Sequence, residues 1–569
     1  MLKKITGIFD LVEKKNKPQM FIIFIMMIFA MCLEAIGIGL IYPLIIFLVE
    51  KDFSNNEFLA NLKNYFPNQD YNDFIIIFLI IIVTIYLLKN LFLALLNYVS
   101  SKFIYNFQAN LSNKLLNLYT SQDYIFFKDK NSSEFIRNII NESNMISFKI
   151  FTPTVVFFSE ILTIIGISFF LFSVEFLGTL IFFVIFVSFS WLFNRLIKKK
   201  ISSWGNKRQI YEGNRIKKLQ EIFGSIKQIK FYNLKNNFNN IFFNINLKYA
   251  SVTSNQAYTE SLPKLIIEII AIFSVSCFIF FLNITSNNNT ELIAILGIFG
   301  AAALKILPSL NRVINSIQNI NFSYPIINTY KKNFKKLLKK NYNKRYKKII
   351  FSISSGIKLK NIKFKYKNKI IFNNLNLSIP SDSVTGIKGR SGLGKTTLID
   401  LLLLLLLPNK GSIICGKNKI DLNPILWREL ISYIPQENYI LDDTVEKNIY
   451  FGVNESNINN ITLEEALTLS DSKIFINSLN KRLNTNLGQN GSKLSGGQKQ
   501  RIGIARGLIR GRPILILDES TSNLDSKTEG KILKRIINSK KFKIIILISH
   551  REEVLKFCDK VIDLNKLLS

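Results

Sequence analysis

Histidine is almost missing from this chain, and cysteine is scarce. Among 569 residues there is one histidine, His550, and there are four cysteines, Cys32, Cys277, Cys415 and Cys558. A single histidine excludes a metal centre built from several histidines. The cysteines lie far apart without C-x-x-C spacing, so we expect four small buried thiols and neither a zinc site nor a disulfide framework.

Acidic residues are also in short supply. The chain has 39 Asp and Glu against 74 Lys and Arg, which gives a formal charge of +35. Such a balance can indicate nucleic-acid binding. The excess is lysine, however, and it accompanies abundant Asn, Ile and Phe, as an A/T-rich coding sequence would give. The basic residues also lie beside apolar segments, where a membrane surface explains them, so we expect no nucleic-acid partner.

Six stretches of the first 320 residues contain few polar side chains. A helix needs about 20 apolar residues to cross ~30 Å of hydrocarbon. The stretches that reach this length are 19–49, 74–99, 150–173, 176–194, 265–284 and 292–317. The last is interrupted by Lys305, Pro308 and Arg312. The polar segment 1–17 lacks a short apolar core with a cleavage site, so we expect no removable signal peptide.

Basic residues mark one end of these spans. Clusters of Lys and Arg precede the first span and follow the fourth and the sixth, whereas 50–72 is net acidic and 283–290 carries no charge. The positive-inside rule then places both termini in the cytoplasm.

Two long segments between the spans would also be cytoplasmic. Segments 100–149 and 195–263 are amphipathic and are predicted to continue the spans as helices. We expect their tips, near 123–128 and 221–228, to dock on the C-terminal half of the protein and to carry motion to the membrane. The alternative is that the tips are solvated loops.

Charged residues inside the spans require partners or water. Lysines lie in or at the edge of three spans and glutamates in others: Lys89, Lys264, Lys305, Glu34, Glu160 and Glu268. A charge at the centre of a membrane helix costs at least ~2.5–3.5 kcal/mol. Two interpretations remain open. Either these charges pair or reach the interface, or the three lysines line a cationic cavity for an anionic, phosphate-bearing substrate.

Two further segments have distinctive patterns. Segment 52–66 has apolar residues near helical spacing, which is typical of either a short helix on the outer leaflet or an ordinary packed loop. Segment 331–348 holds ten Lys and Arg and no acid. We interpret it as a solvated linker helix, to which anionic lipid could add ~1 kcal/mol per charge.

The C-terminal half contains a glycine-rich phosphate-binding pattern. Gly389–Thr396 fits G-x-x-x-x-G-K-[ST], between a β-prone run at 384–387 and a helix-forming run at 396–407. Its glycines let backbone N–H groups point at phosphate oxygens. Lys395 should reach the β and γ phosphates of a nucleotide, and Thr396 should ligate Mg²⁺. The expected nucleotide-binding residues here are Gly389, Arg390, Ser391, Gly392, Leu393, Gly394, Lys395, Thr396 and Thr397.

Two acids and the histidine follow apolar strands. Asp518 and Glu519 end the run 514–519, and His550 follows the run 543–549. Ligands of open α/β sheets bind at the carboxyl ends of the strands. Asp518 would hold Mg²⁺ through water, and Glu519 would act as general base on the attacking water. A lone histidine is usually structural, but this position favours a functional role.

A second anion-binding helix terminus lies at 494–498, before a helical run predicted to start near Lys499. Its expected nucleotide contacts are Ser495, Gly496, Gly497 and Gln498. Because the chain already has its own phosphate loop, this second cradle would serve a nucleotide held by another subunit. The sequence therefore predicts a dimer with ATP at the interface.

Together these residues resemble the ATP-binding cassette (ABC) family, and the whole chain is similar to a type IV exporter half-transporter. The resemblance implies an α-helical membrane domain of six transmembrane helices at 1–330, a basic linker at 331–348 and an α/β P-loop cassette at 349–569.

Single residues also take roles from this resemblance. It makes Gln436 the Q-loop residue, with a catalytic and Mg²⁺-binding role. It makes Tyr366 the aromatic residue beside the nucleobase, and Ser522–Asp525 the D-loop. Gln489 departs from the pattern, since exporters usually carry an acid there, which puts one coupling contact in doubt.

Within this family the chain is most similar to bacterial flippases for lipid-linked oligosaccharides. Met-Leu-Lys-Lys at the N-terminus, Asp-Phe-Ser at 52–54 and Leu307–Arg312 carry that likeness. It implies a homodimer in the bacterial inner membrane that uses ATP and Mg²⁺ to export or flip an amphiphilic, anionic lipid-linked substrate. One alternative is a multidrug, peptide or lipid A exporter. Another is a regulatory membrane protein without powered transport, against which Glu519 argues.

Overall fold

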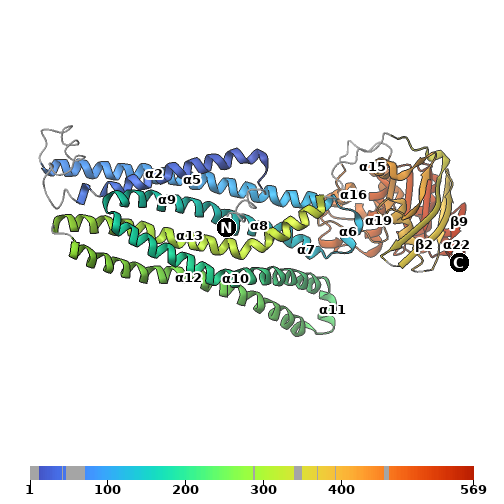
Figure 1. Cartoon of the computed structure of the whole chain (residues 1–569). Coiled ribbons are helices and arrows are strands. Elements are labelled where there is room, and N and C mark those ends of the chain that lie inside the picture. The colour runs from blue at the N-terminus through green and yellow to red at the C-terminus, as the bar shows by residue number, and fades with distance from the viewer. Residues whose placement is uncertain are drawn as a thin grey trace. The chain divides into compact units, whose positions relative to one another are not determined.

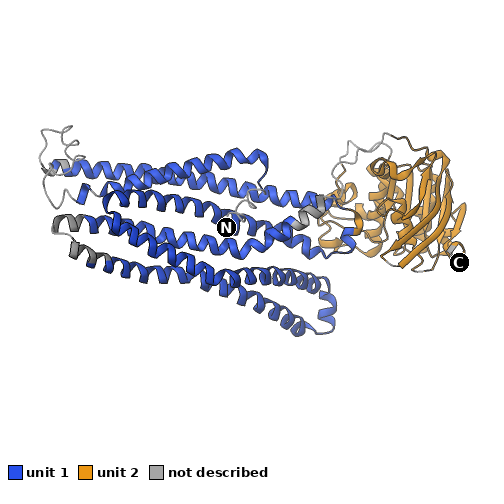
Figure 2. Ribbon diagram, viewed as in Figure 1, with its two compact units in different colours: residues 1–122, 126–342 blue, residues 123–125, 343–569 orange. Residues whose placement is uncertain are grey.

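The computed structural model describes residues 12–41, 43–45, 71–285, 289–338, 349–367, 369–390, 392–453 and 461–568. The chain divides into two compact units (Figure 2), residues 1–122 with 126–342, and residues 123–125 with 343–569. The first is helical, and the second contains the strands (Figure 1). The fold class is therefore as predicted from the sequence.

Long helices make up the first unit. Long apolar runs contribute to α5, α10, α12 and α13, which have 50, 49, 51 and 50 residues. Helix α12 continues through Pro263, and α13 through Pro308 and Pro325. The elements in order are η1 Lys14–Asn16, α2 Lys17–Gly39, α5 Tyr71–Thr120, α6 Tyr124–Lys128, α7 Ser132–Ile136, η2 Arg137–Glu142, α8 Ser143–Ile146, η3 Ser147–Phe151, α9 Thr152–Val174, α10 Phe176–Gly224, α11 Ile226–Phe231, α12 Lys235–Thr285 and α13 Asn289–Leu338.

Five helical segments of the described chain are long and apolar enough to cross a membrane. They are Lys14–Ile45, Ile75–Thr120, Ser132–Val174, Phe176–Gly224 and Ile295–Lys331. These coincide with five of the six expected spans, and the remaining one, 265–284, is helical as part of α12. Segment 52–66 lies outside the described residues. The expected linker begins as the last turns of α13, and 339–348 is likewise outside the described residues.

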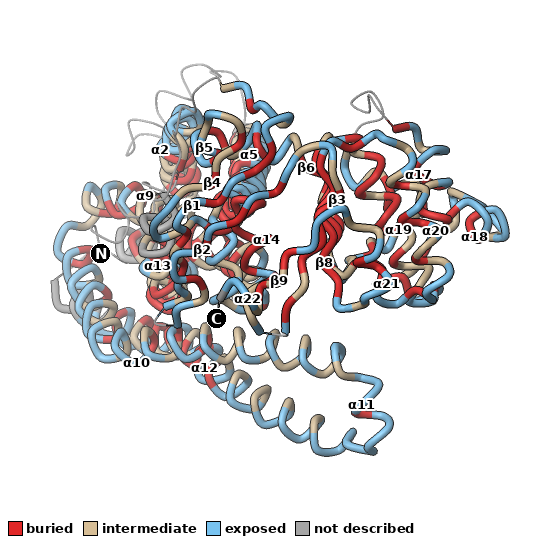
Figure 3. Tube along the Cα trace, turned by 90° about the vertical axis from the view of Figure 1, so that its right-hand side faces the viewer, coloured by how far each residue is buried: buried red, intermediate tan, exposed pale blue. Residues whose placement is uncertain are grey.

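The long segments between the spans are helical, as expected. In Figure 3 the hairpin formed by α10, α11 and α12 is mainly exposed, whereas β8 of the second unit is buried. Elsewhere along its length, α10 packs directly on α13. A Cβ atom added to Gly205 would lie 1.8 Å from the carbonyl oxygen of Phe322, so only glycine permits this approach.

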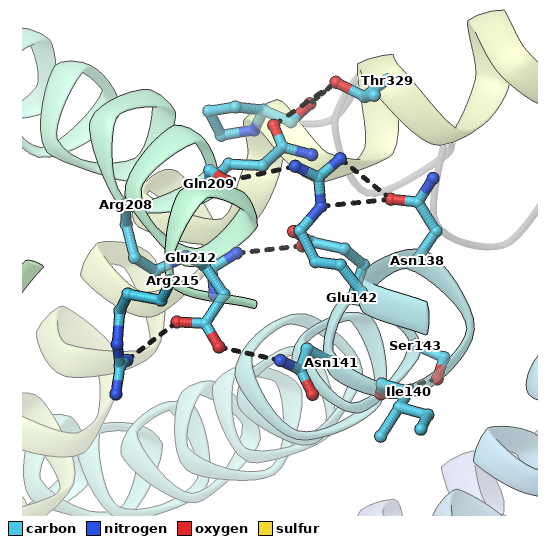
Figure 4. A network of polar contacts seen from close by, with 12 residues as sticks. Asn138, Ile140, Asn141, Glu142, Ser143, Arg208, Gln209, Glu212, Arg215 and Thr329 are labelled. Carbon is cyan, nitrogen blue, oxygen red and sulfur yellow. Dashed lines mark hydrogen bonds and ion pairs between the residues drawn. The ribbon is translucent and has the colours of Figure 1, made fainter. Parts of the chain in front are cut away.

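A buried polar network joins η2 to α10 (Figure 4). The Glu142 carboxylate lies 2.9 Å from the guanidinium of Arg208 and 3.5 Å from that of Arg137. Asn141 donates to Glu212 at 2.8 Å. Glu142 and Arg208 are each only 4% exposed in their side chains, so each charge depends on the other for compensation.

Neighbouring contacts extend this network to α5 and α13. Asn138 donates to the Tyr119 hydroxyl at 2.9 Å, and Thr329 donates to Gln209 at 3.5 Å. Segment η2 has the wider turn of a π-helix, a local irregularity that is common at functional positions. The polar residues thus fix how four helical segments pack at this end of the first unit.

The second unit contains two sheets. The antiparallel sheet has the order β2-β1-β4-β5 and the parallel sheet the order β6-β7-β8-β3-β9. The strands are β1 Ile357–Tyr366, β2 Lys369–Ile379, β3 Ser383–Lys388, β4 Lys410–Cys415, β5 Asn418–Lys419, β6 Ile431–Ile434, β7 Ile514–Asp518, β8 Ile544–Ile548 and β9 Lys560–Asp563. Strands β7 and β8 are buried at every position, as continuous apolar strands of a parallel sheet should be.

Helices surround the parallel sheet. They are η4 Ile353–Ser355, α14 Lys395–Leu402, η5 Ile420–Leu422, α15 Pro424–Glu429, α16 Val445–Tyr450, α17 Leu463–Leu469, α18 Lys473–Asn477, η7 Arg482–Asn484, η8 Gln489–Gly491, α19 Gly496–Leu508, α20 Ser526–Asn538, α21 Glu552–Leu555 and α22 Leu564–Leu568.

Two sequence predictions about burial and helix length are wrong. The leucine run does not stay helical to residue 407. Helix α14 ends at Leu402, and Leu404 takes a left-handed φ of 51°. The amides of Leu405 and Leu406 both donate to the Asp400 carbonyl instead. This turn lets Leu403, Leu404 and Leu406 all enter the core, whereas Leu407 is 56% exposed.

The cysteines are only partly buried. Cys415 is buried and Cys558 half-buried, but Cys32 and Cys277 are exposed on α2 and α12. The outer surface of a membrane helix is as apolar as its packed face, so an apolar sequence does not force the thiol inward. All four thiols are free.

The buried pair predicts a large effect of one substitution. Arg208→Met leaves Glu142 buried with only Arg137 nearby, so we expect the free energy of unfolding to fall by about 3–5 kcal/mol. Denaturation in micelles, followed by circular dichroism, measures this loss. Lys217→Met is the matched control, because its ion pair with Glu221 is exposed and 3.9 Å long, and it should cost less than ~0.5 kcal/mol. Equal losses would contradict the assignment.

Candidate nucleotide-binding site

Three neighbouring parallel strands end at one edge of the sheet. Strand β8 pairs with β7 on one side and β3 on the other, all parallel. The phosphate loop therefore begins beside the segment that carries His550, and Asp518, the last residue of β7, lies one strand further along the sheet. The predicted meeting of these groups at the carboxyl edge agrees with the strand order.

The phosphate loop depends on glycine conformations. Gly392 and Gly394 have φ of 86° and 94°, values that side chains other than glycine rarely adopt. A Cβ atom on Gly394 would also lie 2.6 Å from Ile371 Cγ2. Lys395 starts α14, is buried, and donates from Nζ to the carbonyl of Gly389 at 2.8 Å. The lysine thus folds back over its own loop.

Other predicted loop residues have different environments. Thr396 is exposed and Thr397 is buried. The backbone N–H of Arg390 donates to Asn565 Oδ1 at 3.3 Å, and that of Leu393 donates to the Arg390 carbonyl at 3.4 Å. Ser391 lies outside the described residues.

Glu519 is the centre of the site. Its Oε2 accepts from Gln436 Nε2 at 2.9 Å, and its Oε1 lies 2.8 Å from His550 Nε2 and 3.7 Å from Lys395 Nζ. Lys395 Nζ is also within hydrogen-bonding distance of His550 Nε2. The structure therefore brings together four side chains that the sequence predicted to act on the nucleotide.

The backbone of Glu519 holds its carboxylate in this place. Its φ is 44°, an uncommon value for a residue with a long side chain. Its N–H donates to the carbonyl of Ile548, on the neighbouring strand, at 3.1 Å. This contact between strands supports a strained conformation at a functional residue.

Asp518 is buried beside these groups. Burial raises the pKa of its carboxyl to about 6, with a further upward contribution from the charges of Glu519 and Asp400. Tyr433 Oη donates to Asp518 Oδ2 at 3.3 Å, and burial in turn raises the pKa of the tyrosine. Tyr433 was missed in the sequence, where a tyrosine in an apolar strand gives no signal of such a contact.

The predicted metal ligands are Thr396, Gln436 and Asp518. They offer a hydroxyl, an amide and a carboxylate oxygen, which is the donor type that Mg²⁺ prefers. Within the described residues no cluster of three His, Cys, Asp or Glu could hold a metal. A site with one carboxylate plus phosphate oxygens needs no such cluster, so the residues fit the ion.

The second cradle is a capped helix end. The Ser495 side chain accepts from the N–H of Gln498, and the Gln498 side chain accepts from the N–H of Ser495. Helix α19 therefore starts at Gly496, three residues before the predicted start, because this capping box compensates for two glycines. Ser495 and Gly496 are exposed, so this helix end is open to an anion outside this unit.

The D-loop is held by residues that sequence reasoning missed. Arg551 donates to the carbonyls of Ser522 and Leu524 at 2.7 and 3.2 Å. Gln500 accepts from the N–H of Asn523 at 2.9 Å. Arg551 directly follows His550 in the sequence, and only this adjacency could have indicated a role for the arginine in the site.

Two further residues singled out in the sequence, Tyr366 and Gln489, lie at the ends of secondary-structure elements. Tyr366 ends β1 and meets the ring of Phe364 edge-on at 5.0 Å between centroids. Gln489 is exposed at the start of η8.

Several charged residues of the membrane helices form ion pairs. Glu34 is buried between two lysines, 2.6 Å from Lys305 Nζ and 3.4 Å from Lys89 Nζ. Lys89 also lies 4.0 Å from the centre of the Tyr86 ring. Lys264 is exposed on α12 and is not among the contacts of Glu34.

A second pair joins two other helices. Arg312 donates to both oxygens of Glu160 at 2.6 and 3.0 Å, which links α13 to α9. Unlike Glu34, this carboxylate is matched by a single cation of the described residues.

The part of the chain that contains this site is similar to known proteins. Residues 372–522 match the model of the ABC transporter family. A solved bacterial Atm1-family ABC exporter with ATP bound superposes with a TM-score of 0.75, at 17% identity, over 96% of this chain and 93% of that one. The chain therefore has the fold of an ABC exporter. The matched residues 372–522 lie in its second unit.

The ABC domain also dominates the similarity to relatives. A probable ABC transporter ATP-binding/permease protein of Haemophilus influenzae is 41% identical over 209 residues, 37% of this chain and 38% of the relative. A putative export ATP-binding/permease protein of Rickettsia typhi is 40% identical over 37% of each. The match thus spans under two fifths of these relatives. An ATP-dependent lipid A-core flippase of Francisella tularensis subsp. holarctica is 27% identical over 81% of this chain and 75% of the relative.

The raised pKa of Asp518 predicts a pH dependence. Its carboxyl is charged above about pH 6 and protonated below it, and only the charged form attracts a divalent cation. We therefore expect Mg²⁺-dependent ATP affinity to fall as pH drops through 6, measured by calorimetry on the full chain. ATP binding without Mg²⁺ should lack this step, as should Asp518→Asn. A Mg²⁺ dependence that is flat across pH 6 in the unmodified protein would contradict the role of Asp518.

Proposed function

We propose that this chain is one half of a homodimeric, ATP-driven exporter or flippase of the bacterial inner membrane. The observation that carries the proposal is the position of Glu519, held by Gln436 and His550 beside the phosphate-loop lysine. This hydrolytic arrangement occurs in a chain with five membrane-length helices among its described residues. ATP hydrolysis coupled to transport explains both features.

Glu519 has the geometry of a general base. Water between its carboxylate and the γ-phosphate would give up a proton to Glu519 as its oxygen attacks phosphorus. The bond from phosphorus to the β–γ bridging oxygen breaks, so that ADP and inorganic phosphate leave. Gln436 and His550 hold the carboxylate by hydrogen bonds, and His550 would turn to the γ-phosphate when nucleotide enters. Mg²⁺ held by Asp518, Thr396 and Gln436 would supply positive charge to the phosphate oxygens. Lys395 would exchange its contacts with Glu519 and His550 for the phosphates.

A dimer follows from the second cradle. Ser495 and Gly496 are exposed, and the contacts described for Ser495 lie within its own turn. They would close on nucleotide held by the partner. To move a two-state equilibrium from mostly inward to mostly outward, ATP must favour one state by ~5.5 kcal/mol. Charge-assisted contacts at two sites can supply that amount, and the tips α6 and α11 would carry the motion.

The buried charges favour an anionic substrate. Two lysines share the single carboxylate of Glu34, which leaves one formal positive charge uncompensated by that residue. An amphiphile with a pyrophosphate-linked glycan would supply the missing negative charge. The lipid A-core flippase similarity over 81% of this chain favours lipid A-like molecules as a second candidate. Proteoliposomes with polyprenyl-pyrophosphate glycans, lipid A or drugs would distinguish the substrates by flipping rate.

The general-base role predicts a separation of binding from turnover. Glu519→Gln keeps a side chain that can accept from Gln436 but cannot take a proton, so ATP should bind while hydrolysis falls at least 100-fold. Lys395→Ala should instead lose nucleotide affinity. Phosphate release and nucleotide binding, measured on the same preparations, separate the two effects. Near-normal hydrolysis by Glu519→Gln would refute its assignment.

The lysines around Glu34 predict a defect limited to transport. The double variant Lys89→Gln, Lys305→Gln should abolish stimulation of the ATPase by the lipid-linked substrate and leave the basal rate within about twofold. Lys264→Gln is the matched control, because Lys264 does not contact Glu34. Flipping in liposomes is the measurement. Unchanged flipping by the double variant, or an equal loss in the control, would reject the anionic-substrate assignment.

A further inference from the structure

The first unit contains an apolar groove away from the charges around Glu34. It has a volume of about 400 Å³ and is enclosed by α2, α5, η3 and α9. Its lining residues are Lys17, Met20, Phe21, Ile23, Phe24, Met27, Phe103, Phe151, Thr154, Val155 and Phe158. Neither the ATP site nor the proposed substrate charges use any of them.

The floor of the groove is apolar. Ile23, Phe103 and Phe151 are buried beneath it. The one hydroxyl on its lining belongs to Thr154, which donates to the Ile150 carbonyl of its own helix. Water would therefore find no hydrogen-bond partner inside, and hydrocarbon is the matching content.

Two aromatic side chains from different helices meet in the lining of the groove. Phe24 on α2 and Phe158 on α9 face each other edge-on, with centroids 6.4 Å apart. Phe21 is 64% exposed at the rim. An acyl chain in the groove would contact these rings and the side chains of α5 and η3, in contrast to a chain resting on the convex surface of a single helix.

The groove has the depth of one leaflet. Its lining on α2 runs from Lys17 to Met27, ten residues, and a helix rises about 1.5 Å per residue. The resulting ~15 Å is half of a ~30 Å hydrocarbon core. Lys17 begins α2 at the end that the positive-inside rule places in the cytoplasm.

One end of the groove is cationic. Lys17 is exposed, and within the described residues it has no acidic partner, because the nearby Glu13 is held by Lys15 and Lys114. Since the surrounding lipid is as apolar as the groove, burial of hydrocarbon alone gives little selectivity. The charge of the headgroup at Lys17 would decide which lipid is retained.

We propose that this groove binds an anionic phospholipid of the inner leaflet, with an acyl chain lying against Phe24 and Phe158 and the headgroup phosphate at Lys17. The lipid is a bound component of the first unit and differs from the transported molecule. The proposal does not depend on ATP hydrolysis or on the identity of the substrate.

The test counts lipids on the purified full-length protein. Delipidated protein is titrated with phosphatidylglycerol or phosphatidylcholine, and bound lipid is measured by native mass spectrometry. We expect one tight phosphatidylglycerol per chain, with about fivefold higher affinity than phosphatidylcholine, from ~1 kcal/mol per cation. Lys17→Gln should remove this preference. Lys14→Gln, an exposed lysine of the preceding turn that does not line the groove, should keep it.

Filling the groove tests its shape. Val155→Trp should remove the tight lipid site, whereas Leu91→Trp, at an exposed position of α5 outside the groove, should not. If Val155→Trp aggregates, Phe21→Ala opens the rim and should weaken lipid binding instead. An unchanged lipid count in the groove variants, or equal effects of Lys17→Gln and Lys14→Gln, would overturn the proposal. Loss of a dimer by Val155→Trp at constant lipid count would assign the groove to a second copy and overturn it as well.

Discussion

The nucleotide site depends on the parallel pairing of β7, β8 and β3. This register brings the carboxyl ends of the three strands to the same edge of the sheet. The side chains that follow the strands are therefore close together. The N–H of Glu519 bonds to the end of β8, so even the strained residue takes its place from the sheet. Because these strands are buried on both faces, the geometry of the site is as rigid as the core of the unit.

Charge compensation organises the helical unit in the same way. Glu34 with its two lysines, Glu160 with Arg312, and Glu142 with Arg208 each link helices that are far apart in sequence. Such pairs are weak evidence for stability. At Glu34 and Glu142, which are buried, they nevertheless select one arrangement, since any other packing would leave a buried charge alone. The pair at Glu34 differs because its cations outnumber its carboxylate.

Local motifs made much of this structure predictable. The phosphate loop and the LSGGQ segment carry their own backbone requirements, so residues such as Gly394 and Ser495 could be assigned from sequence. The membrane helices could be predicted because length and apolarity are set by the bilayer. What could not be predicted depends on contacts between distant segments: Tyr433 on Asp518, Arg551 on the D-loop, and the turn at Leu404. A run of seven leucines favours a helix locally, and only the core decides where it ends.

The direct backbone contact between Gly205 and Phe322 has a mechanical consequence. No side chain separates α10 from α13 at that point. The two helices therefore have no side chains there that could change rotamer when one helix moves relative to the other. A tilt of the long α10 must therefore turn about this fulcrum and swing its two ends in opposite senses. A methyl group there would push the helices apart and shift the pivot along the pair.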